Sequence, residues 1–383
     1  MPAQRLASIT PFHVMKLLAR ARELEAQGRS VVHMEIGEPD FVTPQPVTDA
    51  GIRALQQGLT HYTPAVGLPE LCAAVARHYR DRFGVSVDAR RILITPGASG
   101  ALQLILAALV DPGSQVLMAD PGYPCNRNFV YLYGGEAVMI PVGPEHDYQL
   151  SAAALEQHWS EHSSCVMLAS PSNPTGTVVS RSALQAMLEV IRARAGVLIV
   201  DEIYQNLCYH GEPETALALG EDMFVINSFS KYFGMTGWRL GWLVAPEAYI
   251  DHLDMLAQNL FLAASTPAQH AALAAFTPPA RDVLEQRRGE FQRRRDYLLP
   301  ALRELGFGIP VEPQGAFYLY ADCSRFSADS FAFATELLEK ACVAITPGID
   351  FGDYRAAQHV RFAYTTSLQK LQQGVRRLAD FIT

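Results

Sequence analysis

The chain has 383 residues, 49% of them hydrophobic, which is enough for two or three ordinary domains with extensive cores. Its 39 acidic and 31 basic residues give a net charge of −8, the wrong sign for a protein that binds the phosphate backbone of nucleic acids. No stretch approaches the roughly 18 uninterrupted apolar residues of a membrane span, so we expect a soluble globular protein with neither nucleic-acid nor membrane partners.

The first 28 residues predict an amphipathic helix and not an export signal, because basic side chains interrupt every apolar run in them. Six cysteines are spread along the chain without a C-x-x-C pair. Neither a zinc site nor a redox dithiol is therefore indicated, and we expect no bound metal. Reduced thiols favour a cytoplasmic protein.

From about residue 70 the chain alternates between short apolar runs, rich in β-branched residues, and segments of helical character. This pattern is typical of an α/β domain whose largely parallel sheet is covered by helices on both faces. Beyond two adjacent prolines it changes to a long charged helix followed by strands and a further helix, as in a smaller α+β domain. We expect an N-terminal arm that forms part of the small domain at 1–47, a large domain at 48–280 and a small domain at 281–383. The strand candidates of the large domain begin at Ile92, Gln115, Ala137, Cys165, Val197 and Phe224.

A basic run, R-R-G-E-F-Q-R-R-R-D-Y at residues 287–297, lies in the long charged helix. The acidic residues Glu290 and Asp296 are interleaved with its arginines at helical spacing. We interpret the run as a solvated helix face.

Polar and glycine-rich loops follow three of the strand candidates, where ligands of open α/β sheets bind. The first, P-G-A-S-G, opens an apolar helix and suits a phosphate, although a tight turn that needs Gly97 and Gly100 explains it equally well. In S-P-S-N-P-T-G two prolines fix the backbone around Asn173. In D-E-I-Y, Asp201 follows a buried strand and needs a positive partner there, unless it only caps a helix.

One lysine, Lys231, stands among apolar and aromatic residues in S-F-S-K-Y-F-G-M-T-G-W-R-L-G-W at residues 228–242. Its side chain either extends to water or loses its hydration. A desolvated lysine has a lowered pKa and can attack a carbonyl to form a Schiff base. This stretch alone leaves both interpretations open.

Taken together, these loops resemble those of the class I/II aminotransferases, the aspartate aminotransferase superfamily of pyridoxal 5′-phosphate enzymes with fold type I. The resemblance implies a mostly parallel seven-stranded sheet covered by helices, with a smaller α+β domain. It also implies a cytoplasmic homodimer with shared active sites that transfers an amino group from an L-amino acid to a 2-oxo acid. The motifs that carry it are IGEPDF at Ile36, HYTPAVGLPELCAAV at His61, TPGASGAL at Thr95, DPGYP at Asp120, SPSNPTG at Ser170, DEIY at Asp201, the lysine motif at Ser228, GAFYLY at Gly315 and VRFAYTTS at Val360.

The resemblance implies a role for each residue around the cofactor ring. Lys231 would hold the cofactor as a Schiff base and then move the proton at the substrate α-carbon. Asp201 would keep the pyridine nitrogen protonated. Asn173 and Tyr204 would donate hydrogen bonds to the phenolic oxygen, and Tyr123 would stack on the ring.

The resemblance also implies a phosphate site and a substrate site. Arg361 would clamp the substrate carboxylate with two parallel N–H donors, helped by Asn173, and Gly37 would let the backbone approach the same carboxylate. Ser265 is a further candidate for the partner subunit's phosphate. The phosphate would be bound by Ala98, Ser99, Ser228, Arg239 and, from a second subunit, Tyr62.

Other enzyme and binding classes fit less well. No G-x-G-x-x-G opens a strand-to-helix turn, which argues against a nicotinamide-dependent oxidoreductase. The nucleophile elbow of a serine hydrolase needs glycine two residues after the serine, where Ala101 follows Ser99. A regulator that retains this fold would need a DNA-binding extension, for which we expect no room. A carbon–sulfur β-lyase that uses the same lysine, aspartate and arginine stays open as an alternative.

The donor specificity depends on one position. Aspartate-specific members with the animal-type site carry a second arginine four residues before the serine of an S-x-P segment. Anchoring that segment on Ser265 places Phe261 at the arginine position. A carboxylate beside a phenyl ring would lose hydration without gaining a partner. We therefore expect a neutral, aliphatic or aromatic donor, with 2-oxoglutarate or pyruvate as acceptor.

Overall fold

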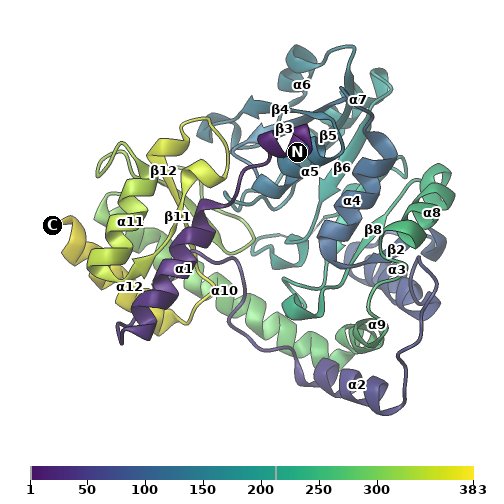
Figure 1. The fold of residues 1–383 in the computed structure, drawn as a ribbon, viewed down its shortest axis with the longest axis horizontal. Coiled ribbons are helices and arrows are strands. Elements are labelled where there is room, and N and C mark those ends of the chain that lie inside the picture. Colours follow the sequence, from purple (N-terminus) through teal and green to yellow (C-terminus); the bar gives the residue numbers. More distant parts are fainter. Residues whose placement is uncertain (1, 212–213) are drawn as a thin grey trace.

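The computed structural model describes residues 2–211 and 214–383. Within them lies a seven-stranded sheet of order β2-β8-β7-β6-β5-β3-β4, in which β8 alone runs antiparallel to its neighbours (Figure 1). The prediction of a mostly parallel seven-stranded sheet is confirmed. The strands are β2 (Ile92–Thr95), β3 (Gln115–Asp120), β4 (Glu136–Pro141), β5 (Ser163–Ala169), β6 (Val197–Asp201), β7 (Met223–Ser228) and β8 (Gly241–Val244).

Alternate residues of the central strands enter two separate cores, one on each face of the sheet. On β6, Leu198 and Val200 belong to one core and Ile199 to the other. Both faces are covered, which explains why the strands read as continuous apolar runs. Helices α4 (Gly97–Leu109), α5 (Pro124–Leu132) and α8 (Ile250–Leu260) cover one face; α3 (Pro69–Phe83), α6 (Ala152–His158) and α7 (Arg181–Ala193) cover the other.

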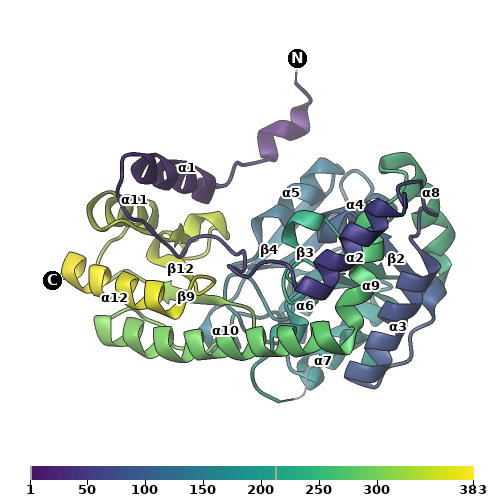
Figure 2. The same cartoon turned by 90° about the horizontal axis from the view of Figure 1, so that it is seen from below.

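A small lobe is built around a three-stranded antiparallel sheet of order β11-β12-β9. The N-terminal helix α1 packs against this lobe, and β1 pairs in parallel with β10, so a segment from the first 33 residues joins the C-terminal part of the chain here (Figures 1 and 2). Its elements are α1 (His13–Ala26), β1 (Val32–His33), β9 (Tyr318–Asp322), α11 (Ser330–Ala341), β10 (Val343–Ala344), β11 (Thr346–Pro347), β12 (His359–Ala363) and α12 (Leu368–Ile382).

The 28-residue helix α10 (Pro278–Leu305) runs beneath both parts of the molecule (Figure 2). It contacts α12 of the small lobe and α2 (Gln45–Gln56) of the large part, which also carries α9 (Thr266–Leu273). The interpretation of its basic run as a solvated face is wrong for Arg294 and Arg295, whose side chains are only 3% and 2% exposed. Because α10 is covered from two sides, these guanidinium groups are buried and hydrogen-bond to protein atoms.

The carboxyl ends of β5, β6 and β7 open toward the small lobe, where residues of both parts line a common cavity. This is the edge at which open α/β sheets bind ligands. No helix of the described residues is long and apolar enough to cross a membrane.

Candidate active site

Eleven of the twelve predicted site residues line one cavity of about 320 Å³ between the sheet and the small lobe. This volume lies at the lower end of the roughly 300–1,000 Å³ found for ligand sites. Residues far apart in the sequence therefore meet here. The eleven are Gly37, Ala98, Ser99, Tyr123, Asn173, Asp201, Tyr204, Ser228, Lys231, Arg239 and Arg361.

The half-buried Lys231 directs its amine into this cavity. Its Nζ donates a hydrogen bond to the carbonyl oxygen of Gly37 at 2.7 Å and lies 5.9 Å from the ring centroids of Tyr204 and Phe317. Burial, followed by the nearby Arg361 guanidinium, lowers the pKa of Lys231 to about 8. The amine is thus desolvated, as one of the two interpretations of its motif requires.

Asp201 ends β6 at the floor of the cavity and is 6% exposed. Its Oδ1 accepts a hydrogen bond from the backbone N–H of Ile203 at 3.0 Å, in a turn and not at the start of a helix. Burial raises the pKa of Asp201 to about 6, against the opposing charge of Lys231. No ion pair joins this carboxylate within the described part of the chain, so a cationic group in the cavity would stabilise its charge.

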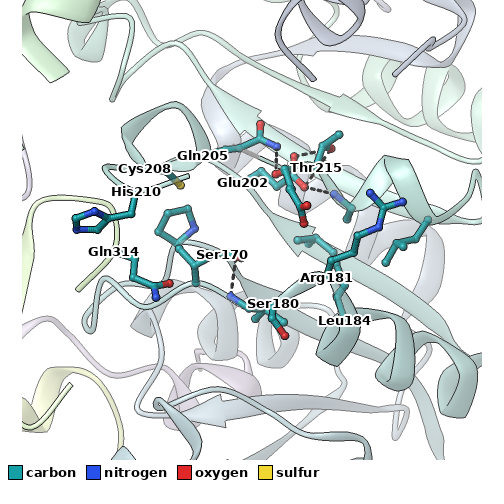
Figure 3. A pocket seen from close by; sticks show the side chains of 17 residues that line it. Ser170, Ser180, Arg181, Leu184, Glu202, Gln205, Cys208, His210, Thr215 and Gln314 are labelled. Atoms are coloured by element: carbon teal, nitrogen blue, oxygen red, sulfur yellow. Dashed lines mark hydrogen bonds between the residues drawn. The ribbon is translucent and has the colours of Figure 1, made fainter. Parts of the chain in front are cut away.

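The neighbouring acid, Glu202, points away from this cavity. It accepts hydrogen bonds from Thr215 Oγ1 at 3.0 Å and from the N–H of Ala216 at 2.7 Å, and burial raises its pKa to about 8. It lines a second cavity of about 170 Å³ together with Arg181 (Figure 3). Of the two adjacent carboxylates, only Asp201 faces the lysine.

Arg361 on β12 is 5% exposed and makes no ion pair within the described residues. Its Nη1 donates to Asn173 Oδ1 at 2.8 Å, and its Nη2 donates to the carbonyl oxygen of Glu35 at 2.7 Å and to Thr346 Oγ1 at 3.2 Å. Its Nε is buried without a partner. A buried guanidinium held only by neutral oxygens is suited to a carboxylate ligand.

The start of α4 and Arg239 form a candidate anion-binding site in the same cavity. Gly97 has a φ of +71°, and a Cβ at this position would lie 2.7 Å from Arg239 Nη2. Glycine is thus needed here for backbone reasons as well as for close approach. Ala98, Ser99 and Ser228 line the same part, and the N–H groups of a helix start attract anions.

Tyr62, the twelfth of these residues, does not line the cavity; it is 83% exposed. Ser265, just before α9, and Phe261, just after α8, also lie outside it. The Thr266 hydroxyl donates to the carbonyl oxygen of His61 at 2.6 Å, so the Tyr62 and Ser265 segments are neighbours.

Several lining residues were missed at the level of sequence. Tyr318 hydrogen-bonds to Tyr204 between their hydroxyl oxygens at 2.8 Å, and a Cβ on Gly37 would overlap its hydroxyl. Tyr318 belongs to the GAFYLY motif, but nothing in the local sequence pattern indicates that it lines the site. The α1 residues Val14 and Met15 also line the cavity, and no local pattern indicated that helix as part of the site.

Comparison with known proteins gives consistent matches over the whole chain. Residues 29–378 match the family model described as aminotransferase class I and II. The chain is 38% identical to the valine–pyruvate aminotransferase of Mycobacterium tuberculosis, over 98% of this chain and 97% of the relative. It is 34% identical to the aspartate aminotransferase of Geobacillus stearothermophilus, over 99% and 98%. The crystal structure of an aminotransferase from Mycobacterium tuberculosis superposes with a TM-score of 0.96 at 38% identity, covering 100% of this chain and 99% of that chain.

The lowered pKa of Lys231 predicts an unusual pH dependence of amine labelling in the ligand-free protein. With a pKa of about 8, about one amine in ten is neutral at pH 7. We expect acetylation of Lys231 by acetic anhydride to rise about tenfold between pH 6 and pH 7 and to level off above about pH 8. Peptide mass spectrometry measures this rate against the exposed lysines Lys16, Lys340 and Lys370. A rate for Lys231 that keeps rising tenfold per unit to pH 10 would contradict the desolvated amine.

Proposed function

The chain belongs to the class I and II aminotransferases, and we propose that it transfers the amino group of a neutral, aliphatic or aromatic L-amino acid to pyruvate or 2-oxoglutarate. The observation that carries this proposal is the desolvated Lys231 amine, which shares one cavity with Asp201 and Arg361. As an aminotransferase of this family, the enzyme uses pyridoxal 5′-phosphate. The β-lyase alternative has no support from the relatives described above.

The cavity fits this cofactor on features of the chain itself. The Gly97 turn, the first N–H groups of α4, Ser228 and Arg239 suit a phosphate group. The buried and unpaired Asp201 suits a cationic ring nitrogen. When bound, pyridoxal phosphate supplies an aldehyde that a primary amine attacks and an electron-withdrawing ring that stabilises negative charge on the substrate α-carbon.

Lys231 supplies the nucleophile and the proton acceptor in this proposal. A pKa of about 8 leaves a substantial fraction of neutral amine near neutral pH, whereas an ordinary lysine is almost fully charged. The hydrogen bond to the Gly37 carbonyl oxygen orients the amine in the cavity. Once free, the same amine takes and returns the proton at the substrate α-carbon.

The polar groups around Lys231 divide the remaining tasks. Asp201 would hold a positive charge on the ring nitrogen of the bound cofactor. Asn173 Oδ1 accepts a hydrogen bond from Arg361, which leaves the amide NH₂ group of Asn173 free to donate to the phenolic oxygen of the ring. The hydroxyl of Tyr204, which hydrogen-bonds to Tyr318, would be a second donor to this oxygen. Tyr123, which lines the cavity, would stack on one face of the ring.

Arg361 binds the α-carboxylate of both substrates. Its Nε has no protein partner, and no carboxylate of the described residues competes for it in an ion pair. Glycine at position 37 lets the Tyr318 hydroxyl pack against the backbone, because this hydroxyl occupies the place where a Cβ would lie. The cation that the carboxylate needs is thus buried and, within the described residues, free of any competing acid.

The charges of the cavity support a neutral donor side chain. Lys231, Arg239 and Arg361 are the cations among its described lining residues, and each already has a role in the proposal. The acids Glu35 and Asp350 line the same cavity. A second substrate carboxylate would be buried without a partner and near like charges, which costs free energy.

Apolar side chains complete this argument. Phe12, Val14, Met15, Phe129 and Phe351 line the cavity, and a hydrophobic donor gains about 25 cal/mol for each Å² of apolar surface that it buries against them. The valine–pyruvate relative supports such a donor, and the aspartate relative weighs against it. The charges of the cavity favour the neutral donor over aspartate.

We further propose a homodimer in which each subunit lends Tyr62 to the phosphate site of the other. Tyr62 is 83% exposed and the nearby chain also exposes Val42, at 81%, and Leu55, at 60%. Such apolar exposure is typical of an interface.

The first test replaces the lysine. Lys231→Ala removes nucleophile and proton acceptor together, so we expect transaminase activity to fall roughly thousandfold or more. Borohydride treatment followed by mass spectrometry should attach the cofactor to the unmodified enzyme at residue 231 and not to the variant. Lys340→Ala, at an exposed lysine, is the control and should behave as the unmodified enzyme. More than a few percent of activity in Lys231→Ala would refute the assignment.

The second test compares donors. We expect kcat/KM for valine, methionine and phenylalanine to exceed that for aspartate by about tenfold or more, because an unpaired buried carboxylate costs at least the about 1.4 kcal/mol of that ratio. Each donor is measured with pyruvate and with 2-oxoglutarate. If kcat/KM were highest for aspartate, the neutral-donor proposal would be wrong, whereas the aminotransferase assignment would stand.

The third test concerns the subunit arrangement. Sedimentation at micromolar concentration should show a dimer. Tyr62→Phe should keep the dimer but weaken cofactor binding about tenfold, the effect of losing one hydrogen bond to a charged group. A fully active monomer, or a Tyr62→Phe enzyme with unchanged cofactor affinity, would contradict the shared phosphate site.

A further inference from the structure

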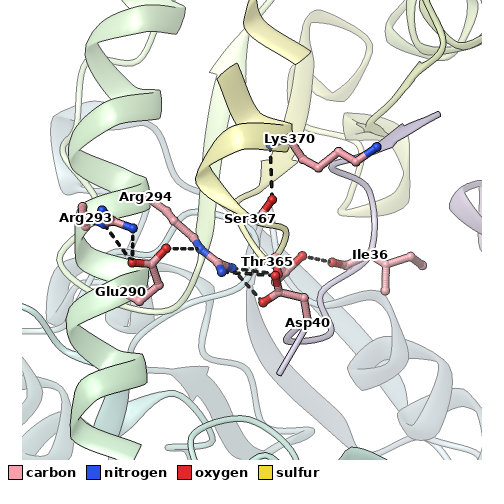
Figure 4. Close-up of polar contacts among 8 residues, drawn as sticks. All are labelled: Ile36, Asp40, Glu290, Arg293, Arg294, Thr365, Ser367 and Lys370. Carbon is pink, nitrogen blue, oxygen red and sulfur yellow. Dashed lines mark hydrogen bonds and ion pairs between the residues drawn. The ribbon is translucent and has the colours of Figure 1, made fainter. Parts of the chain in front are cut away.

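Arg294 of α10 is buried at the centre of a polar network that no catalytic group enters (Figure 4). Its Nη1 and Nη2 donate to the two carboxylate oxygens of Asp40 at 2.8 and 3.2 Å. Nη1 also donates to the carbonyl oxygen of Thr365 at 3.0 Å, and Nε to Glu290 Oε1 at 3.0 Å. One guanidinium thus binds the loop that contains Asp40, the segment that follows β12, and Glu290 of its own helix.

The loop that contains Asp40, residues 34–41, is bound by further hydrogen bonds to β12 and to the residues that follow this strand. The Thr365 hydroxyl donates to the carbonyl oxygen of Ile36 at 2.8 Å. The backbone N–H of Asp40 donates to the carbonyl oxygen of Thr365 at 3.2 Å. The N–H of Ala363 donates to the carbonyl oxygen of Met34 at 2.7 Å. Residues 34–41 therefore lie along β12 and the residues after it, with contacts at Met34, Ile36 and Asp40.

Two carbonyl oxygens of this segment touch the cations of the active site. Glu35 accepts from Arg361 Nη2, and Gly37 accepts from Lys231 Nζ, both at 2.7 Å. A shift of the segment would therefore move the acceptors that orient the guanidinium and the amine. In this way Arg294 is connected to both groups without touching either.

The chemistry of this contact requires an arginine. The guanidinium lies over Phe41, with its carbon 4.9 Å from the ring centroid, while its fork binds both oxygens of Asp40. A lysine has one nitrogen and cannot pair with two carboxylate oxygens, a carbonyl and Glu290 in this planar arrangement.

We propose that Arg294, through Asp40, is a positioning residue for substrate carboxylate binding: it fixes residues 34–41 so that the Glu35 and Gly37 carbonyl oxygens hold Arg361 and Lys231 in place. This inference rests on the roles proposed above for those two residues. Because α10 contacts both parts of the molecule, Arg294 also ties the segment to the helix that connects them.

The neighbouring Arg293 provides a matched control. It lies on the same helix and pairs with the same Glu290, at 2.7 Å, but it is 64% exposed and contacts neither Asp40 nor Thr365. Arg293→Lys and Arg294→Lys are thus the same substitution at adjacent positions, with and without the contact to the segment. Asp40→Asn removes the charge at the other end of the contact.

The experiment measures kcat, KM and amide hydrogen exchange for these three variants and the unmodified enzyme. For Arg294→Lys and Asp40→Asn we expect KM for the best donor to rise fivefold or more, with a smaller change in kcat. Exchange of the amides of residues 34–41, measured without cofactor, should become at least fivefold faster. Arg293→Lys should match the unmodified enzyme within twofold in each quantity. The effects of Arg294→Lys and Asp40→Asn should not add in the double variant, because both break the same contact.

Other results would overturn the proposal. Arg294→Lys and Asp40→Asn enzymes that match Arg293→Lys in KM and exchange would exclude a positioning role. A lowered unfolding midpoint with unchanged KM and unchanged exchange in residues 34–41 would assign Arg294 to stability alone. If the unmodified enzyme transaminates no donor, the proposed function fails, and the exchange comparison still decides whether Arg294 fixes the segment.

Discussion

The structure around the active site depends on the desolvation of one amine. Lys231 is placed among aromatic rings and close to Arg361, and both burial and the second cation lower its pKa to about 8. Burying an amine costs free energy unless a hydrogen-bond acceptor replaces the lost water. For Lys231 this acceptor is the carbonyl oxygen of Gly37. Because β6 and β7 are parallel neighbours, their carboxyl ends bring Asp201 and the loop that carries Lys231 to the same edge of the sheet.

The directions of two adjacent side chains at the end of β6 decide which acid faces the lysine. Asp201 and Glu202 are adjacent and both are buried, yet they face different cavities. Glu202 has hydrogen-bond partners from Thr215 and Ala216, whereas Asp201 has one backbone donor and faces the lysine. An acid with satisfied oxygens stabilises its own loop, and the incompletely satisfied one is available to a ligand.

Sequence reasoning succeeded where the signal is local and failed where partners are distant. The sheet and the positions of Lys231 and Asp201 follow from apolar runs and the loops after them. Arg294 was misread as solvated because its partners, Asp40 and Thr365, lie 254 and 71 residues away, so no window of sequence contains them. Val14 and Met15 were missed for the same reason, since they reach the cavity only when α1 packs on the small lobe.

The segment that carries Gly37 has a charged anchor at each end, and the one at its N-terminal end depends on pH. At one end His33 Nδ1 lies 2.7 Å from Glu35 Oε1, which raises the pKa of His33 to about 9. This pair therefore contributes its full stability below about pH 6.5 and loses it as pH rises through about 9. At the other end the Arg294 guanidinium binds both carboxylate oxygens of Asp40 and the carbonyl oxygen of Thr365. The anchor that weakens as pH rises is therefore the one beside Glu35, whose carbonyl oxygen accepts from Arg361.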